Sequence, residues 1–204
     1  MRNPLDYPDG ATPLDLDEMD GLRHKHVTTQ GELDHLEQAN IQNGLQWMKR
    51  SRKSDIMHES YVRELHRRLF GEVWSWAGTF RTTEKNIGVD PSEIAVQLHV
   101  LLGNVRYWIE NKIYPPEEIA IRFHHRLVFI HPFPNGNGRH ARVMADALLA
   151  KIFNKSPIDW AGGQDLQEEG QRRSEYIMAL QMADQENYEP LMVFAGLKSE
   201  RSQN

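Results

Sequence analysis

The sequence predicts an all-α protein with one short β-hairpin and an N-terminal helical extension. Three observations lead to this fold class. Apolar residues recur every three or four positions over most of the chain, helix-start signals precede several of these stretches, and one segment alone has a convincing β pattern. The chain has 204 residues, of which 39% are hydrophobic and 26% charged. This composition is typical of a globular domain that buries a core without covalent staples.

The N-terminal part divides into an arm and a helix. Residues 1–27 contain three prolines and a dense run of acidic side chains, so we expect an irregular arm. Thr29 and Glu32 have the spacing of a capping box, and apolar residues at helical spacing continue to about Arg50. We therefore expect two units, an arm and helix over residues 1–53 and a helical domain over residues 54–198.

The next segment combines a helix with the only β signal. A helix is expected to begin after Ser54 and to close at Gly71 and the aromatic cluster that follows it. Residues 79–89 place threonine, phenylalanine and valine around a short polar turn, which predicts a hairpin. A hairpin this short cannot form a core alone, so it should lie against helices.

The remaining elements are predicted to be helices. Asp90 and Pro91 are a strong start signal for a helix that extends to about Asn111. Pro116 opens another helix, which the loop His131–Gly138 ends, and the following helix begins near Asn137 or Gly138. A last pair of helices is expected over residues 166–184 and 190–198.

Charge and residue usage exclude several classes of function. There are 24 basic and 29 acidic residues, and the net charge of −5 argues against nonspecific nucleic-acid binding. The absence of cysteine excludes disulfides, cysteine-ligated zinc and a thiol nucleophile. No apolar run approaches 18 residues, and the first residues carry no export signal. We therefore expect a cytoplasmic protein that does not act at a membrane.

The segment from His131 to Arg142 carries the clearest chemistry. A glycine-rich turn that enters a helix N-terminus points unpaired backbone N–H groups at one spot, which suits phosphate. Arg139 and Arg142 lie three apart on that helix and favour a polyphosphate ligand. His131 enters from the other side of the loop, and it is suited to take a proton from a hydroxyl because the pKa of histidine ordinarily lies near neutral pH.

Other interpretations of the same residues remain open. The glycines and Asn137 could serve only to turn the chain and cap the helix, with the arginines paired to surface acids. The ten histidines could instead indicate a metal-dependent hydrolase, although adjacent His124 and His125 diverge on a helix and no His-Glu-x-x-His motif occurs.

The segment resembles the signature of the Fic family, His-x-Phe-x-acidic-Gly-Asn-Gly-Arg-x-x-Arg. Every fixed position matches except Asn135, where the family usually has Asp or Glu. Residues 69–78 resemble the family segment that leads into its target-docking flap, and the match extends over about residues 55–197. The N-terminal arm resembles the bacterial Fic subgroup called mobile mystery protein B.

The resemblance implies a Fic-like helical domain that transfers AMP from ATP to a Ser, Thr or Tyr hydroxyl of a target protein. In that scheme His131 is the general base, Phe133 anchors the loop, and the hairpin docks the target by strand addition. The resemblance implies that Gly136, Asn137 and Gly138 form the phosphate cradle and that Arg139 and Arg142 hold the outer phosphates. Tyr176 would lie beside the adenine. The flap residues that would meet the target are Thr82, Thr83 and Glu84.

The Asn135 that replaces the family's usual acidic residue affects the expected binding of Mg²⁺. An acidic side chain there would bind the Mg²⁺ that bridges the phosphates, whereas Asn135 offers one neutral carbonyl oxygen. Phosphates and water can hold Mg²⁺ with few protein ligands, so we expect Mg²⁺ binding to persist in weakened form. A catalytically weak or inactive nucleotide-binding module, or transfer of a different phosphate-bearing group, is the alternative.

Glu37 lies inside the apolar stripe of the first long helix. A carboxylate there either reaches water at the edge of the stripe or meets a cation. By resemblance it would be an inhibitory residue that holds Arg142 and displaces the γ-phosphate. However, Leu33 and Gln38 depart from the usual inhibitory pattern, which has Ser or Thr four positions before the Glu and Gly or Asn directly after it. A separately encoded regulator is a further expected partner.

Overall fold

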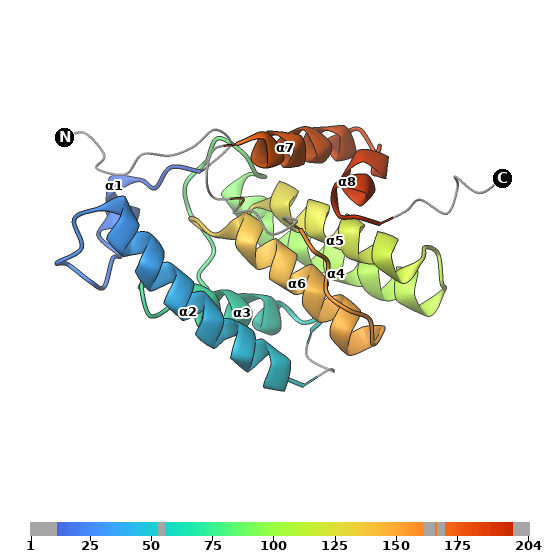
Figure 1. The fold of residues 1–204 in the computed structure, drawn as a ribbon, viewed down its shortest axis with the longest axis horizontal. Coiled ribbons are helices and arrows are strands. Elements are labelled where there is room, and N and C mark those ends of the chain that lie inside the picture. The colour runs from blue at the N-terminus through green and yellow to red at the C-terminus, as the bar shows by residue number, and fades with distance from the viewer. Residues whose placement is uncertain (1–11, 53–55, 161–165, 167–169, 198–204) are drawn as a thin grey trace.

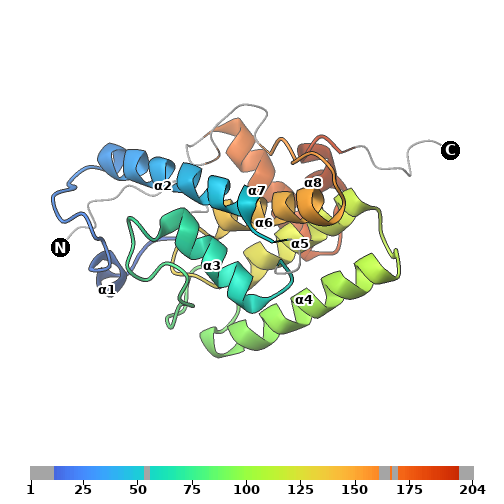
Figure 2. The same ribbon diagram turned by 90° about the horizontal axis from the view of Figure 1, so that it is seen from below.

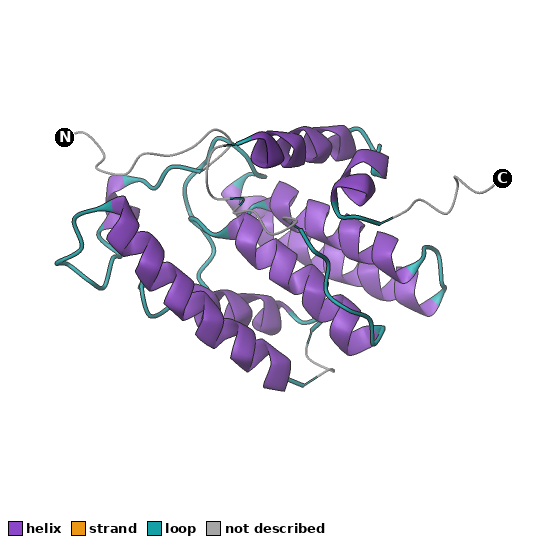
Figure 3. Ribbon diagram, in the orientation of Figure 1, coloured by secondary structure: helices purple, strands orange, loops and turns teal. Residues whose placement is uncertain are grey.

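The computed structural model describes residues 12–52, 56–160, 166 and 170–197. Among these residues the regular elements are helical, which confirms the all-α class (Figure 3). The helices are α1 (Leu16–Met19), α2 (Gln30–Arg50), α3 (Glu59–Phe70), α4 (Ile94–Glu110), α5 (Pro116–Ile130), α6 (Asn137–Ile152), α7 (Gln171–Asp184) and α8 (Glu189–Phe194), with a 3₁₀ turn at Pro91–Glu93.

The α5–α6 pair lies at the centre of the molecule, with helices on either side (Figure 1). One face of the pair packs with α2, α3 and α4, as the view from below also shows (Figure 2). The other face packs with α7 and α8. A helix that is covered on both sides buries side chains on two faces, as α5 does with Phe123 and Ile121 and α6 does with Ala141 and Ala145.

The predicted helix starts are largely confirmed. The Thr29 side chain accepts the N–H of Glu32, and α2 runs from Gln30 to Arg50. Asp90 Oδ1 accepts the N–H of Ser92 at 2.8 Å, which caps the 3₁₀ turn that leads into α4. The loop between α5 and α6 also lies where the sequence predicts it. Residues 53–55, 167–169 and 198, where some expected boundaries fall, lie outside the described residues.

The arm is less irregular than expected, because it contains the one-turn helix α1. Glu18 Oε2 accepts the backbone N–H of Asp15 at 2.8 Å, which closes this turn at its N-terminus. The end of α1 also packs against the body of the protein, since the indole N–H of Trp76 donates to the carbonyl of Glu18 at 2.9 Å.

The predicted hairpin at 79–89 is wrong, since this segment forms a loop of turns and bends. Its two arms pair with the chain between α5 and α6 instead of with each other. The N–H of Arg81 donates to the carbonyl of Pro132 at 2.9 Å, and the N–H of Val89 donates to that of Ile130 at 3.4 Å. The guanidinium of Arg81 fills the space between the arms and donates to the carbonyls of Thr83 and Val89. We call residues 79–89 the flap.

No helix among the described residues is both long enough and apolar enough to cross a membrane.

Candidate functional site

The chain between α5 and α6 is a tight loop fixed in the core. α5 ends at His131, whose φ of 53° and ψ of 60° lie in the left-handed region that ordinary residues seldom occupy. Strained backbone of this kind is common at functional sites. Phe133 is fully buried and stacks on the His66 ring with centroids 3.7 Å apart, which confirms that Phe133 anchors the loop.

Two further residues set the shape of the loop. The Asn137 side chain accepts the N–H of Phe133 at 2.9 Å and donates to its carbonyl at 2.7 Å. Both polar atoms of this side chain therefore make hydrogen bonds inside the loop. Gly136 has a φ of +77°, and a Cβ there would lie 2.7 Å from the Phe70 ring, so only glycine fits.

The N-terminus of α6 opens toward the site. Among the residues that the structure describes, no side chain caps this helix, and its first turn directs backbone N–H groups and the positive end of the helix dipole toward the site. A Cβ at Gly138 would meet nothing closer than the Arg142 Nη1, at 3.7 Å, so this side of the turn is open. The arrangement can hold phosphate oxygens.

His131 faces this N-terminus as a neutral base. It is 5% exposed, and burial lowers its pKa to about 4. Its Nδ1 lies 3.2 Å from the carbonyl of Val128, which can only accept, so Nδ1 carries the proton. The unprotonated Nε2 therefore points outward, where it lies 2.9 Å from the hydroxyl of Thr12.

The two arginines begin on the same helix and then separate. The guanidinium of Arg139 lies 4.7 Å from the centroid of the Phe70 ring, on the side of α2 and α3. The guanidinium of Arg142 lies 5.6 Å from the centroid of the Tyr176 ring, on the side of α7. Residues three apart on a helix differ by about 60° in direction, which is enough to send the two side chains to opposite walls of one cavity.

A cavity of about 400 Å³ joins these groups. This volume lies within the range of small-molecule sites. The Tyr176 hydroxyl pairs with the His124 Nε2 at 2.9 Å, which fixes the tyrosine ring as one wall. The predicted residues that line the cavity are His131, Asn135, Gly136, Asn137, Gly138, Arg139, Arg142 and Tyr176.

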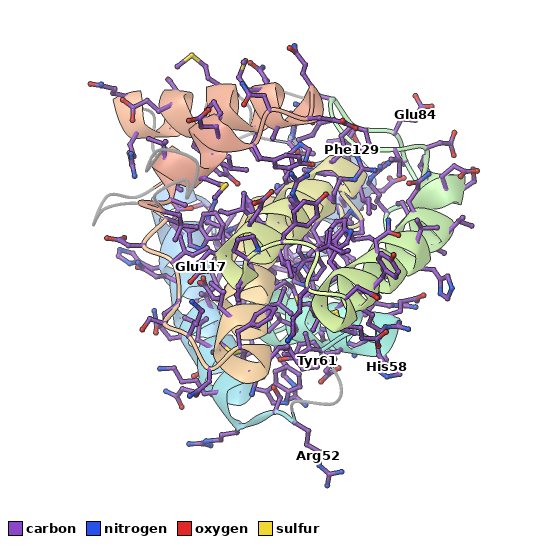
Figure 4. The ribbon with its side chains drawn as sticks, turned by 90° about the vertical axis from the view of Figure 1, so that its right-hand side faces the viewer. Arg52, His58, Tyr61, Glu84, Glu117 and Phe129 are labelled. Carbon is purple, nitrogen blue, oxygen red and sulfur yellow. The ribbon has the colours of Figure 1, made fainter. Side chains whose placement is uncertain are left out.

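The predicted flap residues do not line this cavity. Thr82, Thr83 and Glu84 are exposed, and Figure 4 shows Glu84 projecting outward at the edge of the molecule. The flap reaches the cavity through Ile87 and Gly88. Gly88 has a φ of +114°, and a Cβ there would lie 2.7 Å from that of His131, so glycine lets the flap close on the histidine.

Asn135 does not form a magnesium site in this structure. Its Oδ1 already accepts the N–H of Gly136 at 2.6 Å and lies 3.4 Å from the Nη2 of Arg139, while its Nδ2 donates to the carbonyl of Thr12. Within the described part of the chain, no group of three His, Cys, Asp or Glu side chains could hold a metal ion. The donor set therefore does not fit a bound Mg²⁺, and no step is assigned to one.

Glu37 is buried and paired, but not with the arginine that the resemblance implied. The structure corrects the pairing with Arg142, because Glu37 Oε2 forms its ion pair with Arg139. Its Oε1 accepts the indole N–H of Trp74 at 2.6 Å. The cause is the direction of Arg139, which leaves α6 on the side that α2 covers.

Three functional contacts were not predicted. His66 accepts the N–H of Gly78 on Nδ1 and donates from Nε2 to the carbonyl of Asn135, so this neutral histidine holds both the flap and the loop. Arg81 binds the carbonyl of His131 at 2.7 Å. Thr12 touches His131 across 119 positions of sequence. No periodicity or motif in the sequence signals such long-range contacts.

Together, the fold and the site define a helical domain whose cavity brings a neutral histidine, a helix N-terminus and two arginines together, a set of groups suited to a phosphate-bearing ligand. The sequence model of the Fic/DOC family matches residues 56–149. This part of the chain is therefore a Fic/DOC family domain.

Curated relatives point to the same family. Protein adenylyltransferase Fic of Aedes aegypti is 29% identical over 154 residues, which is 74% of this chain and 29% of that protein. The protein of the same name from Nematostella vectensis is 27% identical over 176 residues, or 83% of this chain and 39% of that one. The chain thus spans about a third of the length of these relatives.

Solved structures share the fold. Fic-1 of C. elegans (residues 134–508) gives a TM-score of 0.66 at 24% identity, covering 92% of this chain and 55% of that chain. The BepC protein of Bartonella tribocorum, solved with bound AMPPNP, gives a TM-score of 0.66 at 17% identity, covering 94% of each chain.

Proposed function

We propose that this chain is a protein adenylyltransferase, which transfers AMP from ATP to a hydroxyl of a protein. The observation that carries the proposal is the convergence of His131, the open N-terminus of α6 and both arginines on one cavity. The names of the curated relatives and the AMPPNP bound by a structural neighbour support ATP as the substrate.

The proposed reaction is a single displacement at phosphorus. The acceptor hydroxyl donates its hydrogen bond to the His131 Nε2, which the tautomer leaves free as an acceptor. As the oxygen attacks the α-phosphorus, the bond from phosphorus to the oxygen that bridges the α- and β-phosphates breaks. The proton passes to Nε2 and pyrophosphate leaves.

The other residues position the nucleotide. The backbone N–H groups of Asn137, Gly138 and Arg139 face the phosphates that change charge during transfer. Arg142 holds an outer phosphate, and Arg139 joins it once released from Glu37. Tyr176 provides a buried aromatic wall for the adenine. Mg²⁺ would be held mainly by the phosphates, since the described residues offer no preformed site for it.

Glu37 acts as a brake in this proposal. As long as its carboxylate holds Arg139, that arginine is unavailable to the nucleotide. A target segment docks along the flap near Thr82, Thr83 and Glu84, which are exposed for this contact. A separately encoded regulator would act by moving α2 and, with it, Glu37.

Labelled ATP tests the proposal. The protein is incubated with α-labelled or γ-labelled ATP and with candidate target proteins, and wild type is compared with His131→Ala. We expect label on protein from the α position alone, and its loss in the variant. Transfer of only the γ label would indicate a kinase, and binding of ATP without transfer of either label would indicate a nucleotide-binding module.

A further inference from the structure

The N-terminal arm places a hydroxyl on the catalytic base of its own chain. Thr12 Oγ1 lies 2.9 Å from the Nε2 of His131, and Thr12 is only 7% exposed. Thr12 also lines the cavity formed by the loop and the first turn of α6. A hydroxyl side chain therefore occupies the position that the proposed function assigns to the acceptor.

The direction of this hydrogen bond is set by the histidine. Because the Nδ1 of His131 donates to the Val128 carbonyl, a neutral ring has only its lone pair left at Nε2. Thr12 must donate, with its proton on the line to the base. This is the geometry that removal of a proton requires, with the oxygen within hydrogen-bond reach of the base.

Two side chains hold the arm by its backbone carbonyls at Thr12 and at the next residue. The Asn135 Nδ2 donates to the carbonyl of Thr12 at 2.9 Å, and the Lys85 Nζ donates to that of Pro13 at 3.3 Å. The donor at position 135 exists because this residue is Asn. An ionised Asp accepts only, so it could not make this bond.

Charge complementarity fixes the next turn of the arm on the flap. The side chain of Lys85 is 3% exposed and is paired with Asp15, at 2.9 Å, and with Glu18. Thr83 Oγ1 also donates to Asp15 at 2.9 Å. Thr83, one of the three flap residues that were expected to receive a target, thus contacts the acidic arm of the same chain.

We infer that Thr12 is an acceptor of AMP, modified within its own chain by the site that it covers. This inference rests on the proposed function. The Thr12 Oγ1 attacks the α-phosphorus of ATP, the bond from that phosphorus to the bridging oxygen breaks, and pyrophosphate leaves. The hydroxyl proton passes to the Nε2 of His131, and the product is a threonine–AMP phosphodiester.

Mass spectrometry of the full chain after incubation with ATP and Mg²⁺ tests the inference. Trypsin releases residues 3–23 as one peptide, in which Tyr7 and Thr12 are the only hydroxyl side chains. We expect one AMP on Thr12, retained in Thr12→Ser and in the control Tyr7→Phe, and lost in Thr12→Ala and His131→Ala. The series is repeated with Glu37→Gly, so that the brake does not mask the reaction.

A mixture of two variants tests whether the transfer is intramolecular. Thr12→Ala chains keep the base, and His131→Ala chains keep the acceptor. We expect no AMP on the His131→Ala chains, and a modified fraction in wild type that does not change with protein concentration. AMP on Thr12 of the His131→Ala chains would overturn transfer within one chain.

The remaining outcomes separate this inference from the proposed function. One outcome is AMP on residues other than Thr12, lost in His131→Ala but undiminished in Thr12→Ala. This result would overturn the role of Thr12 and leave adenylyl transfer intact. The arm would then only cover the site. No AMP on this chain, on target proteins or on lysate proteins, with or without Glu37, would overturn both.

Discussion

The Glu37 carboxylate on α2 is divided between two partners that lie on different elements. Its Oε2 pairs with Arg139 at the start of α6, and its Oε1 accepts the Trp74 indole N–H at 2.6 Å. This contact fastens α2 to the first turn of α6. It also sets the charge that a nucleotide would meet there.

Glu37→Gln should release Arg139 while keeping an acceptor for Trp74. We expect ATP to bind about tenfold more tightly, a change of about 1.4 kcal/mol. The free energy of unfolding without ATP should fall by about 1–3 kcal/mol, since a largely buried ion pair is lost. Calorimetric titration and urea unfolding measure the two quantities.

The matched control for this variant is Glu64→Gln, which removes ion pairs with Arg67 and Arg68 on the more exposed surface of α3. It should leave ATP affinity unchanged and alter stability by less than about 1 kcal/mol. If Glu37→Gln bound ATP no better than this control, Glu37 would not restrain the site.

Asn135→Asp should increase the dependence on Mg²⁺ relative to wild type. The new carboxylate adds a charged oxygen ligand and removes the donor that holds the carbonyl of Thr12. We expect ATP affinity and labelling to respond to Mg²⁺ at lower concentrations in the variant. Coincident metal titration curves for the two proteins would count against a role of position 135 in metal binding.

Gly136→Ala should destabilise the fold by about 2–4 kcal/mol, because it combines a left-handed backbone with overlap on the Phe70 ring. Gly103→Ala, in the exposed middle of α4 with no atom within 4 Å of the new Cβ, is the control. It should raise stability by about 0.5–1 kcal/mol. Equal unfolding midpoints for the two variants would contradict the packing described for the loop.

The free energy of unfolding should fall as the pH is lowered, even at pH values at which the carboxylates of the unfolded chain are still ionised. Burial lowers the pKa of His131 and of His140 to about 4. Burial also lowers the pKa values of His66 and His124 well below the ordinary 6.5. Between pH 6.5 and 4 the unfolded chain binds more protons than the native one, so stability falls as pH falls. At pH 5, His131 and His140 should each account for a loss of about 2 kcal/mol.

Asp146 opposes this trend, because burial raises its pKa to about 6. The native protein binds a proton at Asp146 as the pH falls, which should raise the free energy of unfolding by only about 1 kcal/mol by pH 5. The net prediction is a lower urea midpoint at pH 5 than at pH 7.5. A midpoint that stayed constant or rose would show that these histidines are not buried as neutral rings.

Local signals in the sequence predicted most of the fold. The capping box of Thr29 and Glu32 and the Asp90-Pro91 pair act within a few residues, so their structural meaning depends little on the rest of the chain. The segment from His131 to Arg142 is equally local, and the structure brings its cavity-lining residues together.

The errors and omissions share a physical cause, which is contact between distant segments. Arg81 makes the flap a loop by binding carbonyls up to 50 positions away. Glu37 meets Arg139 and not Arg142 because of how α2 lies against α6, which no helical pattern encodes. The contact of Thr12 with His131 depends on the whole path of the arm.

The central claim is that His131, Arg139 and Arg142 act on one bound triphosphate. Binding of ATP and of AMP to the three alanine variants tests it most directly. We predict that Arg139→Ala and Arg142→Ala lose affinity for ATP but not for AMP, and that His131→Ala binds ATP as wild type does yet transfers no AMP. ATP affinities unchanged by both arginine variants, or transfer that survives without His131, would contradict the account.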